Sequence, residues 1–370
     1  MTLKKTNLLS GLTFALAALF AQSAMAQAAD WQKKWDETLA AARKEGKVVV
    51  TGPPDSAVRM ALPPAFKARY GITLEYVGGR SSEVASKMRA ERGAEIYSVD
   101  VMVGGLNTMA TILHREKLID PIKPVLMLPE VLDGSKWHAG KLWFMDPEGM
   151  YVLRLANTAT TLLHINSAGI KPAELRSAKD LLNPKWRGKI AMMDPTIPGS
   201  GTNTAAMLHA ELGEDFVKKL LIDQKPMITR DSRQLTDWVI RGTYPIVFGA
   251  EDEPIEKLRK EGMPLMGVYE LEGIRPATTA GFGLVAMVNK APHPNAAKIF
   301  VNWIASKEGQ EIYTRALGTT PARNDIDAKS FLPAEMIPRP GVNYFDRYDW
   351  EFVLTTTEKV RRSLRETMRR

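Results

Sequence analysis

The stretch DLLNPKWRGKIAMMDPTIPGSGTNTAAML (residues 180–208) joins a short apolar run, a turn rich in proline, glycine and hydroxyl groups, and a run of helical character. KIAMMD (189–194) predicts a buried strand, and PTIPGSGTNT (195–204) predicts a turn that leads into a helix. The first N–H groups of a helix lack internal acceptors and lie at the positive end of its dipole, so they attract anions. We also expect Ser200 or Thr202 to cap this helix.

Strand and helix patterns alternate on both sides of this stretch. Three apolar runs, at 47–52, 72–79 and 98–105, are each followed by residues with helical spacing. Beyond the stretch, YPIVFG (244–249) predicts another strand. Such alternation is typical of parallel strands in an α/β fold.

Further strand-like runs predict that the chain crosses twice between two lobes. YVLRLAN (151–157) and TLLHINS (161–167) lie where a first lobe of ordinary size ends, and GFGLVAMVNKA (281–291) predicts a strand returning to it. We expect two lobes, each a mostly parallel sheet flanked by helices, joined by hinge strands around a cleft for a small ligand. The predicted bounds are 27–152 with 280–370 for lobe 1, and 156–273 for lobe 2.

The first 26 residues have the pattern of a secretory signal peptide. Lys4 and Lys5 precede an apolar run at 8–20, and Ala24-Met25-Ala26 provides the cleavage site. Removing residues 1–26 leaves 344 residues, and because that segment carries two lysines and no acid, the formal charge falls from +8 to +6. We therefore expect an exported protein, and so mild a charge argues against nucleic acid as a partner.

The residue types and motifs that the sequence lacks exclude several kinds of functional site. With no cysteine, the chain has no site for a lipid anchor, a disulfide, a thiolate metal site or a cysteine nucleophile. The five histidines include no pair at i and i+4, and there is no Walker A loop, G-x-S-x-G elbow or G-x-G-x-x-G after a strand. We predict no metal site, no cofactor and no catalytic residues.

Five segments together resemble the periplasmic solute-binding proteins of the ferric-ion-binding-like group, which are type II binding proteins that serve ABC importers. The resemblance covers nearly all of the chain after residue 26 and implies a monomeric solute-binding protein of the periplasm, whose partners are an inner-membrane ABC permease and its ATPase. The segments that carry it are LLHINSAGI (162–170), SAKDLLNPKWRGKIAMMDPTIPGSGT (177–202), VIRGTYPIVFGAEDE (239–253), NKAPHPNAAKIFVNWIASKEGQEIY (289–313) and GTTPAR (318–323).

One departure from the group concerns its metal site. In ferric-binding members, the segment after the strand that matches PIVFG carries adjacent tyrosines whose phenolates hold the metal. Here that segment reads Ala250, Glu251, Asp252, Glu253, and Tyr244 and Tyr269 do not restore the spacing. We therefore expect a small anionic or zwitterionic solute, with ferric ion as the alternative.

Loops that follow the predicted strands provide the candidate ligand residues. In lobe 1, the loops at 52–57, 78–83 and 104–109 combine small residues with short polar side chains. Arg80 is able to hold a carboxylate or phosphate with two hydrogen bonds, or instead to pair with Glu83 or Glu251. The predicted set is Ser56, Arg80, Ser81, Asn107, Thr108, Ser200, Gly201, Thr202 and Glu251.

Alternatives stay open for the acidic run and for the whole chain. The acids at 251–253 either receive a cationic group of the solute or simply occupy a helix N-terminus, where the dipole favours them. The alternative functions are an exported two-lobed enzyme using Asp55 or Glu251, or a sensor subunit that reports to a receptor kinase. The tail EKVRRSLRETMRR (358–370) predicts a basic amphipathic helix packed on lobe 1.

Overall fold

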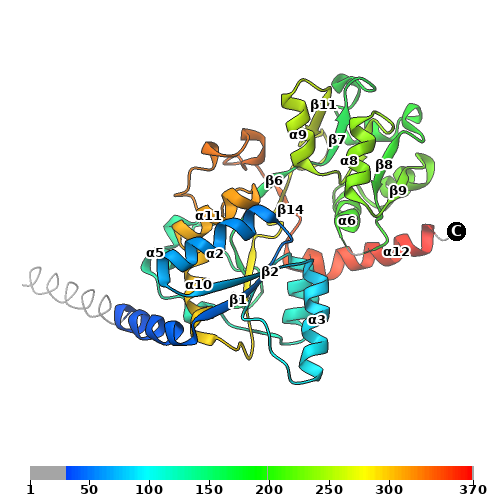
Figure 1. The fold of residues 1–370 in the computed structure, drawn as a ribbon. Helices are drawn as coiled ribbons and strands as arrows, with labels where there is room; N and C mark the ends of the chain where they lie inside the picture. Colours follow the sequence, from blue (N-terminus) through cyan, green and yellow to red (C-terminus); the bar gives the residue numbers. More distant parts are fainter. Residues whose placement is uncertain (1–30, 198, 369–370) are drawn as a thin grey trace, which may run out of the picture.

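The computed structural model describes residues 31–197 and 199–368, which form three sheets covered by helices (Figure 1). The predicted signal peptide lies outside the described residues. The first helix of the described chain spans residues 31–45. No helix within the described residues is long and apolar enough to cross a membrane.

The first sheet has the order β2-β1-β3-β13-β4, with β5 paired to β13. β1 pairs in parallel with both β2 and β3, as the alternation of strand and helix predicts. β13 returns from the other side of the molecule and runs antiparallel to β3. The strands are β1 Lys47–Gly52, β2 Thr73–Gly78, β3 Val101–Gly104, β4 Ile119–Asp120, β5 Leu153–Arg154 and β13 Leu284–Val288.

Helices cover both faces of this sheet (Figure 1). The longest of them begins where the Asp55 carboxylate accepts a hydrogen bond from the Val58 N–H, and it ends at Gly71, whose φ of 77° suits glycine. The α-helices of this part are α2 Ser56–Tyr70, α3 Ser81–Gly93, α4 Leu106–Thr108, α5 Pro129–Leu132, α10 Pro294–Ala305 and α11 Lys307–Leu317, and α4 continues into the π-helix η1 Met109–His114.

The second sheet has the order β11-β7-β10-β8-β9. β8 is parallel to β9 and β10, whereas β7 runs antiparallel to β10 and β11. Its strands are β7 Leu163–Asn166, β8 Ile190–Met193, β9 Met227–Thr229, β10 Ile246–Phe248 and β11 Leu265–Val268. Its α-helices are α6 Ser200–Leu212, α7 Glu214–Lys218, α8 Ser232–Ile240 and α9 Asp252–Lys260, and α7 continues into the π-helix η7 Lys219–Asp223.

A third, small sheet joins the two larger ones, with the order β14-β12-β6 (Figure 1). β6 (Thr158–Thr160) follows β5 of the first sheet and precedes β7 of the second. β12 (Ala277–Thr279) leads back from β11 to β13 and pairs antiparallel with β6. The two crossings expected from the sequence are therefore these two strands, while β14 (Phe345–Asp346) adds a third strand that the sequence did not predict.

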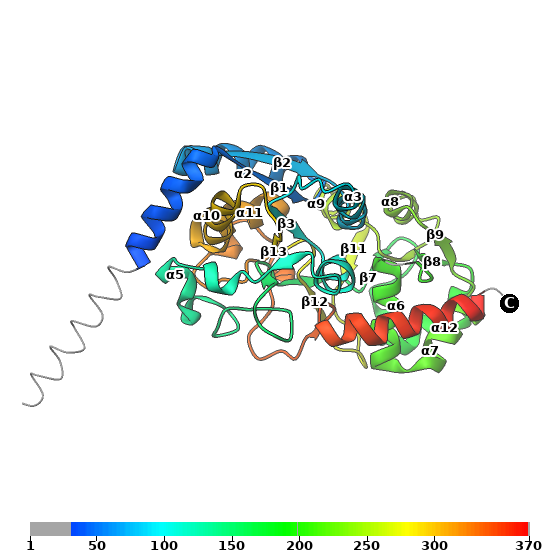
Figure 2. The ribbon, with the colours of Figure 1, turned by 90° about the horizontal axis from the view of Figure 1, so that it is seen from below.

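The C-terminal segment corrects one prediction. α12 (Glu358–Met368) is the amphipathic helix expected there, but it packs against α6 beside the second sheet, not on lobe 1 (Figures 1 and 2). The physical reason is the location of an apolar partner: Val360 and Leu364 are buried next to Val217 of α7. The predicted packing of this helix on lobe 1 is therefore wrong.

The hydrophobic core is continuous across the joint. One cluster of buried residues includes Met102 and Leu106 of the first sheet's side as well as Ile190 of the second sheet. Trp350 and Val353, from the segment between β14 and α12, belong to the same cluster. The C-terminal segment therefore packs against both halves, and its π-helix η10 (Phe352–Thr357) contacts α4 and α6.

Candidate functional site

The predicted ligand residues gather at the carboxyl edges of the two larger sheets. In the first sheet, Ser56, Arg80 and Asn107 lie at the starts of α2, α3 and α4, which follow the adjacent parallel strands β1, β2 and β3. In the second sheet, Ser200 and Glu251 lie at the starts of α6 and α9, which follow β8 and β10. Carboxyl ends of neighbouring parallel strands meet at one edge, the usual place for a ligand in α/β folds.

A close approach of two loops holds Ser81 beside the end of β3. Its Oγ accepts a hydrogen bond from the Gly105 N–H at 3.4 Å. A Cβ added to Gly104 would lie 2.7 Å from the same Oγ, so a side chain there would displace Ser81 from this position. The loops after β2 and β3, predicted separately, therefore form one surface that contains Ser81 and Gly105.

Arg80 is free to bind an anion. Its side chain is exposed, and within the described residues it forms no ion pair, so it pairs with neither Glu83 nor Glu251, the two partners that the sequence left open. Arg80 is the residue before α3, and its carbonyl accepts from Glu83 and Val84. The backbone of Arg80 is thus fixed while its guanidinium group keeps all of its donors.

The other three predicted residues of this edge differ in accessibility. Ser56 is exposed at the first position of α2, next to the capping Asp55. Asn107 is half-buried within α4. Thr108 is only 7% exposed, so it presents little surface to a solute.

The turn before α6 is held by Asp194. Its Oδ1 accepts from the Thr196 N–H at 2.8 Å and the Thr196 hydroxyl at 2.6 Å, and its Oδ2 accepts from Arg230 Nε at 3.0 Å. Burial acts to raise the pKa of Asp194, but these hydrogen bonds outweigh it and lower the pKa below its ordinary value. The charged carboxylate thus fixes the turn that places the start of α6.

The start of α6 carries no side-chain cap, which corrects the expectation that Ser200 or Thr202 would provide one. The residue before the helix is Gly199, with a φ of 148°, and no side chain there accepts from the helix. The buried Thr202 hydroxyl donates to the carbonyls of Pro195 and Ile197, and Ser200 is exposed. Thr202 therefore closes the turn, and no side chain in the described part of the chain accepts from the first N–H groups of α6.

Two glycines bring the loop after β10 beside this helix start. A Cβ added to Gly201 would lie 2.5 Å from the carbonyl oxygens of Met193 and Asp194, so α6 packs directly on the end of β8. Gly249 has a φ of +92°, and its added Cβ would lie 3.8 Å from the Ser200 Oγ. Gly201 therefore has a packing role, and Ser200 lies next to the loop that leads to Glu251.

Glu251 and Asp252 of the acidic run are hydrogen-bonded within their own half of the molecule. Glu251 accepts from the Ser232 hydroxyl at 2.8 Å. Asp252 accepts from the Thr161 hydroxyl at 3.0 Å and lies 2.9 Å from His164 Nε2. Burial acts to raise the pKa of Asp252, but the interactions with His164 and Thr161 outweigh it and lower the pKa.

Tyr348 is a further residue of this surface, one that the sequence did not indicate. A Cβ on Gly105 would lie 3.1 Å from its hydroxyl and 3.6 Å from the Gly281 carbonyl, so the C-terminal segment reaches the start of α4. Burial raises the pKa of Tyr348 to about 12, which keeps its phenol protonated near neutral pH. The run FDRYDW (345–350) is a concentrated aromatic and charged signal, but its spacing alone does not show which loop it meets.

A buried arginine anchors the joint between the sheets. Arg154 of β5 is fully buried and forms an ion pair with Asp346 of β14. Its guanidinium group also donates to Asn157 Oδ1 at 2.7 Å and lies 4.3 Å from the centre of the Trp143 ring. This ion pair therefore ties the third sheet to the first one.

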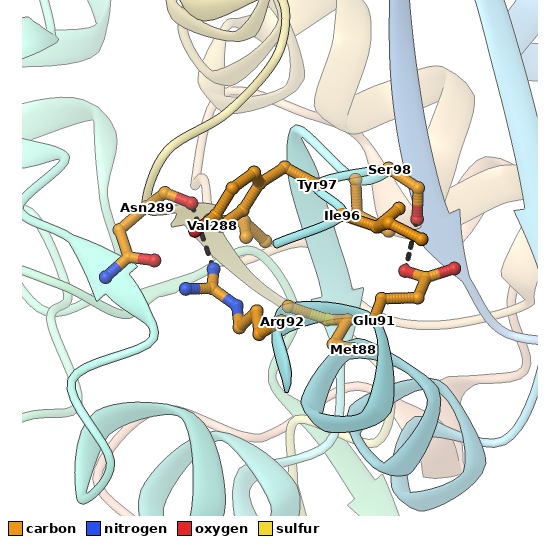
Figure 3. A pocket seen from close by; sticks show the side chains of 9 residues that line it. Met88, Glu91, Arg92, Ile96, Tyr97, Ser98, Val288 and Asn289 are labelled. Atoms are coloured by element: carbon orange, nitrogen blue, oxygen red, sulfur yellow. Dashed lines mark hydrogen bonds between the residues drawn. The ribbon is translucent and has the colours of Figure 1, made fainter. Parts of the chain in front are cut away.

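None of three small cavities that the structure describes is lined by a predicted ligand residue, although one of them is lined by Thr204 of α6 and Phe248 of β10. Figure 3 shows one of them, near Met88 and Tyr97. Most of its polar groups are already paired, because Arg92 donates to the Asn289 carbonyl at 2.9 Å and Ser98 donates to Glu91 at 2.5 Å, and the buried Asn289 Oδ1 is a single acceptor without a described partner. This cavity therefore offers no set of free groups for a solute.

Similar proteins agree with this architecture. The family model described as "Bacterial extracellular solute-binding protein" matches residues 47–316. The Fe(3+)-binding periplasmic protein of Serratia marcescens is 22% identical over 325 residues, which are 80% of this chain and 88% of that protein.

Two solved structures share the fold. The ferric binding protein from Campylobacter jejuni has a TM-score of 0.65 at 15% identity and covers 86% of this chain and 99% of its own. The periplasmic binding protein AfuA from Actinobacillus pleuropneumoniae, solved with fructose-6-phosphate, has a TM-score of 0.63 at 18% identity and covers 88% and 99%. The predicted two-lobed type II architecture is thereby confirmed.

Proposed function

Because the chain belongs to the bacterial extracellular solute-binding protein family, we propose that it captures a small anionic or zwitterionic solute between its two larger sheets. It is a periplasmic solute-binding component of an ABC importer, with a small-molecule ligand and an ABC permease as partners. The proposal concerns which solute binds and which residues hold it.

The observation that carries the proposal is the uncapped start of α6. Among the described residues no side chain accepts from its first N–H groups, and Gly199, Ser200 and Gly201 leave little side-chain bulk in front of them. The N–H groups in the first turn of a helix have no acceptors within the helix, and they lie at the positive end of the helix dipole. This end of a helix therefore favours negative charge. A carboxylate or phosphate group of the solute fits this position.

The first sheet supplies the second half of the site. Arg80 keeps its guanidinium donors free, and Ser81 lies beside the Gly105 N–H at the start of α4. A guanidinium group binds a planar or tetrahedral oxyanion with two parallel hydrogen bonds. Ser56, Asn107 and Thr108 of the same edge complete the proposed contacts, with Thr108 the least exposed.

Glu251 decides between an anion and a zwitterion. Its carboxylate accepts from Ser232, which leaves further acceptor capacity toward a cationic group. Its negative charge would repel an anionic group of the solute placed next to it. We propose that the end of the solute near Glu251 is neutral or positively charged.

Hinge closure is the proposed mechanism. Lobe 1 would comprise 27–152 with the chain from 280 up to the C-terminal segment, and lobe 2 would comprise 156–273 together with α12. A solute that contacts both lobes stabilises the closed form by its differential affinity for it. We propose that the protein is an exported monomer without a lipid anchor, delivers its solute to a permease driven by an ATPase, and neither alters the solute nor binds nucleic acid.

A thermal-shift screen of refolded, ligand-stripped protein tests this function. The panel contains sugar phosphates, phosphonates, small carboxylates, thiamine, polyamines and ferric citrate, and a bound compound raises the melting temperature by mass action. We expect a rise with an anion or zwitterion that is lost in Arg80→Ala and Ser200→Ala. Arg176→Ala is the control, because Arg176 is also exposed and forms no ion pair among the described residues.

Each other outcome of the screen has a definite meaning. A rise with ferric citrate alone would contradict the proposed solute class and support a metal cargo. A rise in melting temperature with polyamines alone would show a cationic solute and so contradict the proposed anionic or zwitterionic class. Recovery of a chemically altered compound after incubation would show an enzyme instead of a binding protein.

A further inference from the structure

We propose that His114, Asp146 and Glu148 form a binding site for a divalent transition metal ion of the Zn²⁺ type, separate from the solute site. Each residue offers one ligand atom, and the three atoms lie within 4.8 Å of one another. His114 Nε2 is 3.3 Å from a Glu148 carboxylate oxygen. The cluster is formed by the end of η1 and the loop before β5.

The carboxylate of Asp146 is held in place by the backbone. It is only 4% exposed, and it accepts hydrogen bonds from the N–H groups of Met150, Tyr151 and Val152 at 2.8–3.0 Å. A carboxylate has about four acceptor positions, so one remains after these three bonds. Asp146 is therefore a preorganised ligand with one remaining lone pair.

The imidazole of His114 is oriented by aromatic neighbours. Its ring makes edge-to-face contacts with Tyr151, at 5.2 Å between ring centres, and with Trp350, at 5.1 Å. These contacts leave Nε2 directed toward Glu148, whose side chain is half-exposed. A metal ion from solvent thus reaches the cluster from the Glu148 side.

The donor set favours one class of metal. One imidazole nitrogen and two carboxylate oxygens suit Zn²⁺ and similar transition metals, whereas Ca²⁺ and Mg²⁺ prefer oxygen alone. With a neutral imidazole, the two carboxylates balance the charge of a divalent ion. Three protein ligands leave a fourth position for water.

Neither the sequence spacing nor the solute site accounts for this cluster. A search for histidine pairs at i and i+4 overlooks it, because His114 and the two acids are more than thirty positions apart in the chain. A bound ion would connect η1 to the loop at 145–150 next to Trp350, at the base of the C-terminal segment. We therefore expect it to stabilise the fold without contacting the solute.

Zn²⁺ titration by calorimetry on chelator-treated protein tests the site. Wild type and the control His138→Gln, an exposed histidine with no described acidic partner, should bind one Zn²⁺. Glu148→Gln and His114→Gln should each weaken Zn²⁺ binding at least about tenfold. Even the loss of a residue that only hydrogen-bonds to a metal ligand typically lowers metal affinity by about that factor. Circular dichroism shows whether each variant is folded, and Glu148→Gln, at an exposed position, is the change that disturbs the fold least.

Two further measurements distinguish a metal site from a simple ion pair. Zn²⁺ should raise the melting temperature of wild type and of Ser200→Ala, but not that of Glu148→Gln. A lack of stoichiometric Zn²⁺ binding would overturn the proposal and leave a His114–Glu148 ion pair. Equal binding of Ca²⁺, or unchanged affinity in both ligand variants, would also overturn it.

Discussion

At the scale of single residues, Asp194 and Gly201 fix the start of α6 for different reasons. The Asp194 carboxylate holds the turn through Thr196 and Arg230. Gly201 lets the helix lie directly on the backbone at the end of β8. Together they hold the first N–H groups of the helix in one place, which a binding site for an anion requires.

Gly201→Ala should destabilise the protein. The new Cβ would lie 2.5 Å from two carbonyl oxygens, and overpacking of this kind costs about 1–3 kcal/mol. Urea unfolding measures the loss. Gly93→Ala is the matched control, because that helical glycine has no atom within 4 Å of an added Cβ and the change should be neutral or stabilising.

Asp194→Asn should lower stability in a pH-dependent way. The pKa of Asp194 is lowered in the folded protein, so its contribution is complete above the unfolded pKa of about 4 and is lost as pH falls through the folded pKa. Wild type should therefore be more stable than the variant at pH 7, and the gap should close in acid. Urea midpoints measured across this pH range would contradict the account if the gap stayed constant.

The hydrogen-bond partners of individual side chains could not be predicted from the sequence. The prolines and glycines at 195–199 correctly mark a turn, but the hydroxyl residues at 200–204, which were predicted to belong to it, form the first residues of α6. Which hydroxyl is free depends on the path of the turn, and Thr202 donates to two carbonyls within it. Likewise, the acids at 251 and 252 have hydrogen-bond partners from distant parts of the chain, Ser232 and Thr161, that no local pattern indicates.

At the scale of elements, the C-terminal segment reaches from one half of the molecule to the other. β14 joins the third sheet, η10 contacts α4 and α6, and α12 packs on α6 (Figure 2). The periodicity of 358–368 predicted the helix but not its partner, because an apolar stripe fits any complementary surface. The alternating strands, in contrast, were predictable because parallel pairing follows from the strand and helix order.

Leu364→Ala should destabilise the protein by about 2–4 kcal/mol, because it removes a buried side chain between α12 and the second half. Leu354→Ala is the control, since that leucine is 37% exposed and its truncation should cost much less. Chemical unfolding of the two variants compares them directly. Equal small effects would show that α12 is not packed as described.

At the scale of the whole molecule, three short strands connect the two halves. β6 and β12 carry the chain across, and β14 is tied to β5 of the first sheet through the Arg154–Asp346 pair. The sequence predicted the first crossing from the size of an ordinary lobe and the second from the strand-like run at 281–291. The third strand was missed because two residues give no periodicity to detect.

Asp346→Asn should be strongly destabilising. It leaves the fully buried Arg154 without its carboxylate, and removing one partner of a buried pair costs about 3–5 kcal/mol. Glu270→Gln is the matched control, because it breaks an exposed pair with Arg339 that is worth less than about 1 kcal/mol. Thermal and urea unfolding of both variants measure the difference, and similar losses would contradict the role of the buried pair.

The most direct test of the central claim is calorimetric titration of the sugar phosphate, phosphonate or carboxylate that gives the largest thermal shift. If the solute bridges both sheets, Arg80→Ala and Ser200→Ala should each weaken binding at least about tenfold, or about 1.4 kcal/mol, while Arg176→Ala binds as wild type does. Unchanged affinity in either Arg80→Ala or Ser200→Ala would contradict a site shared between the two sheets.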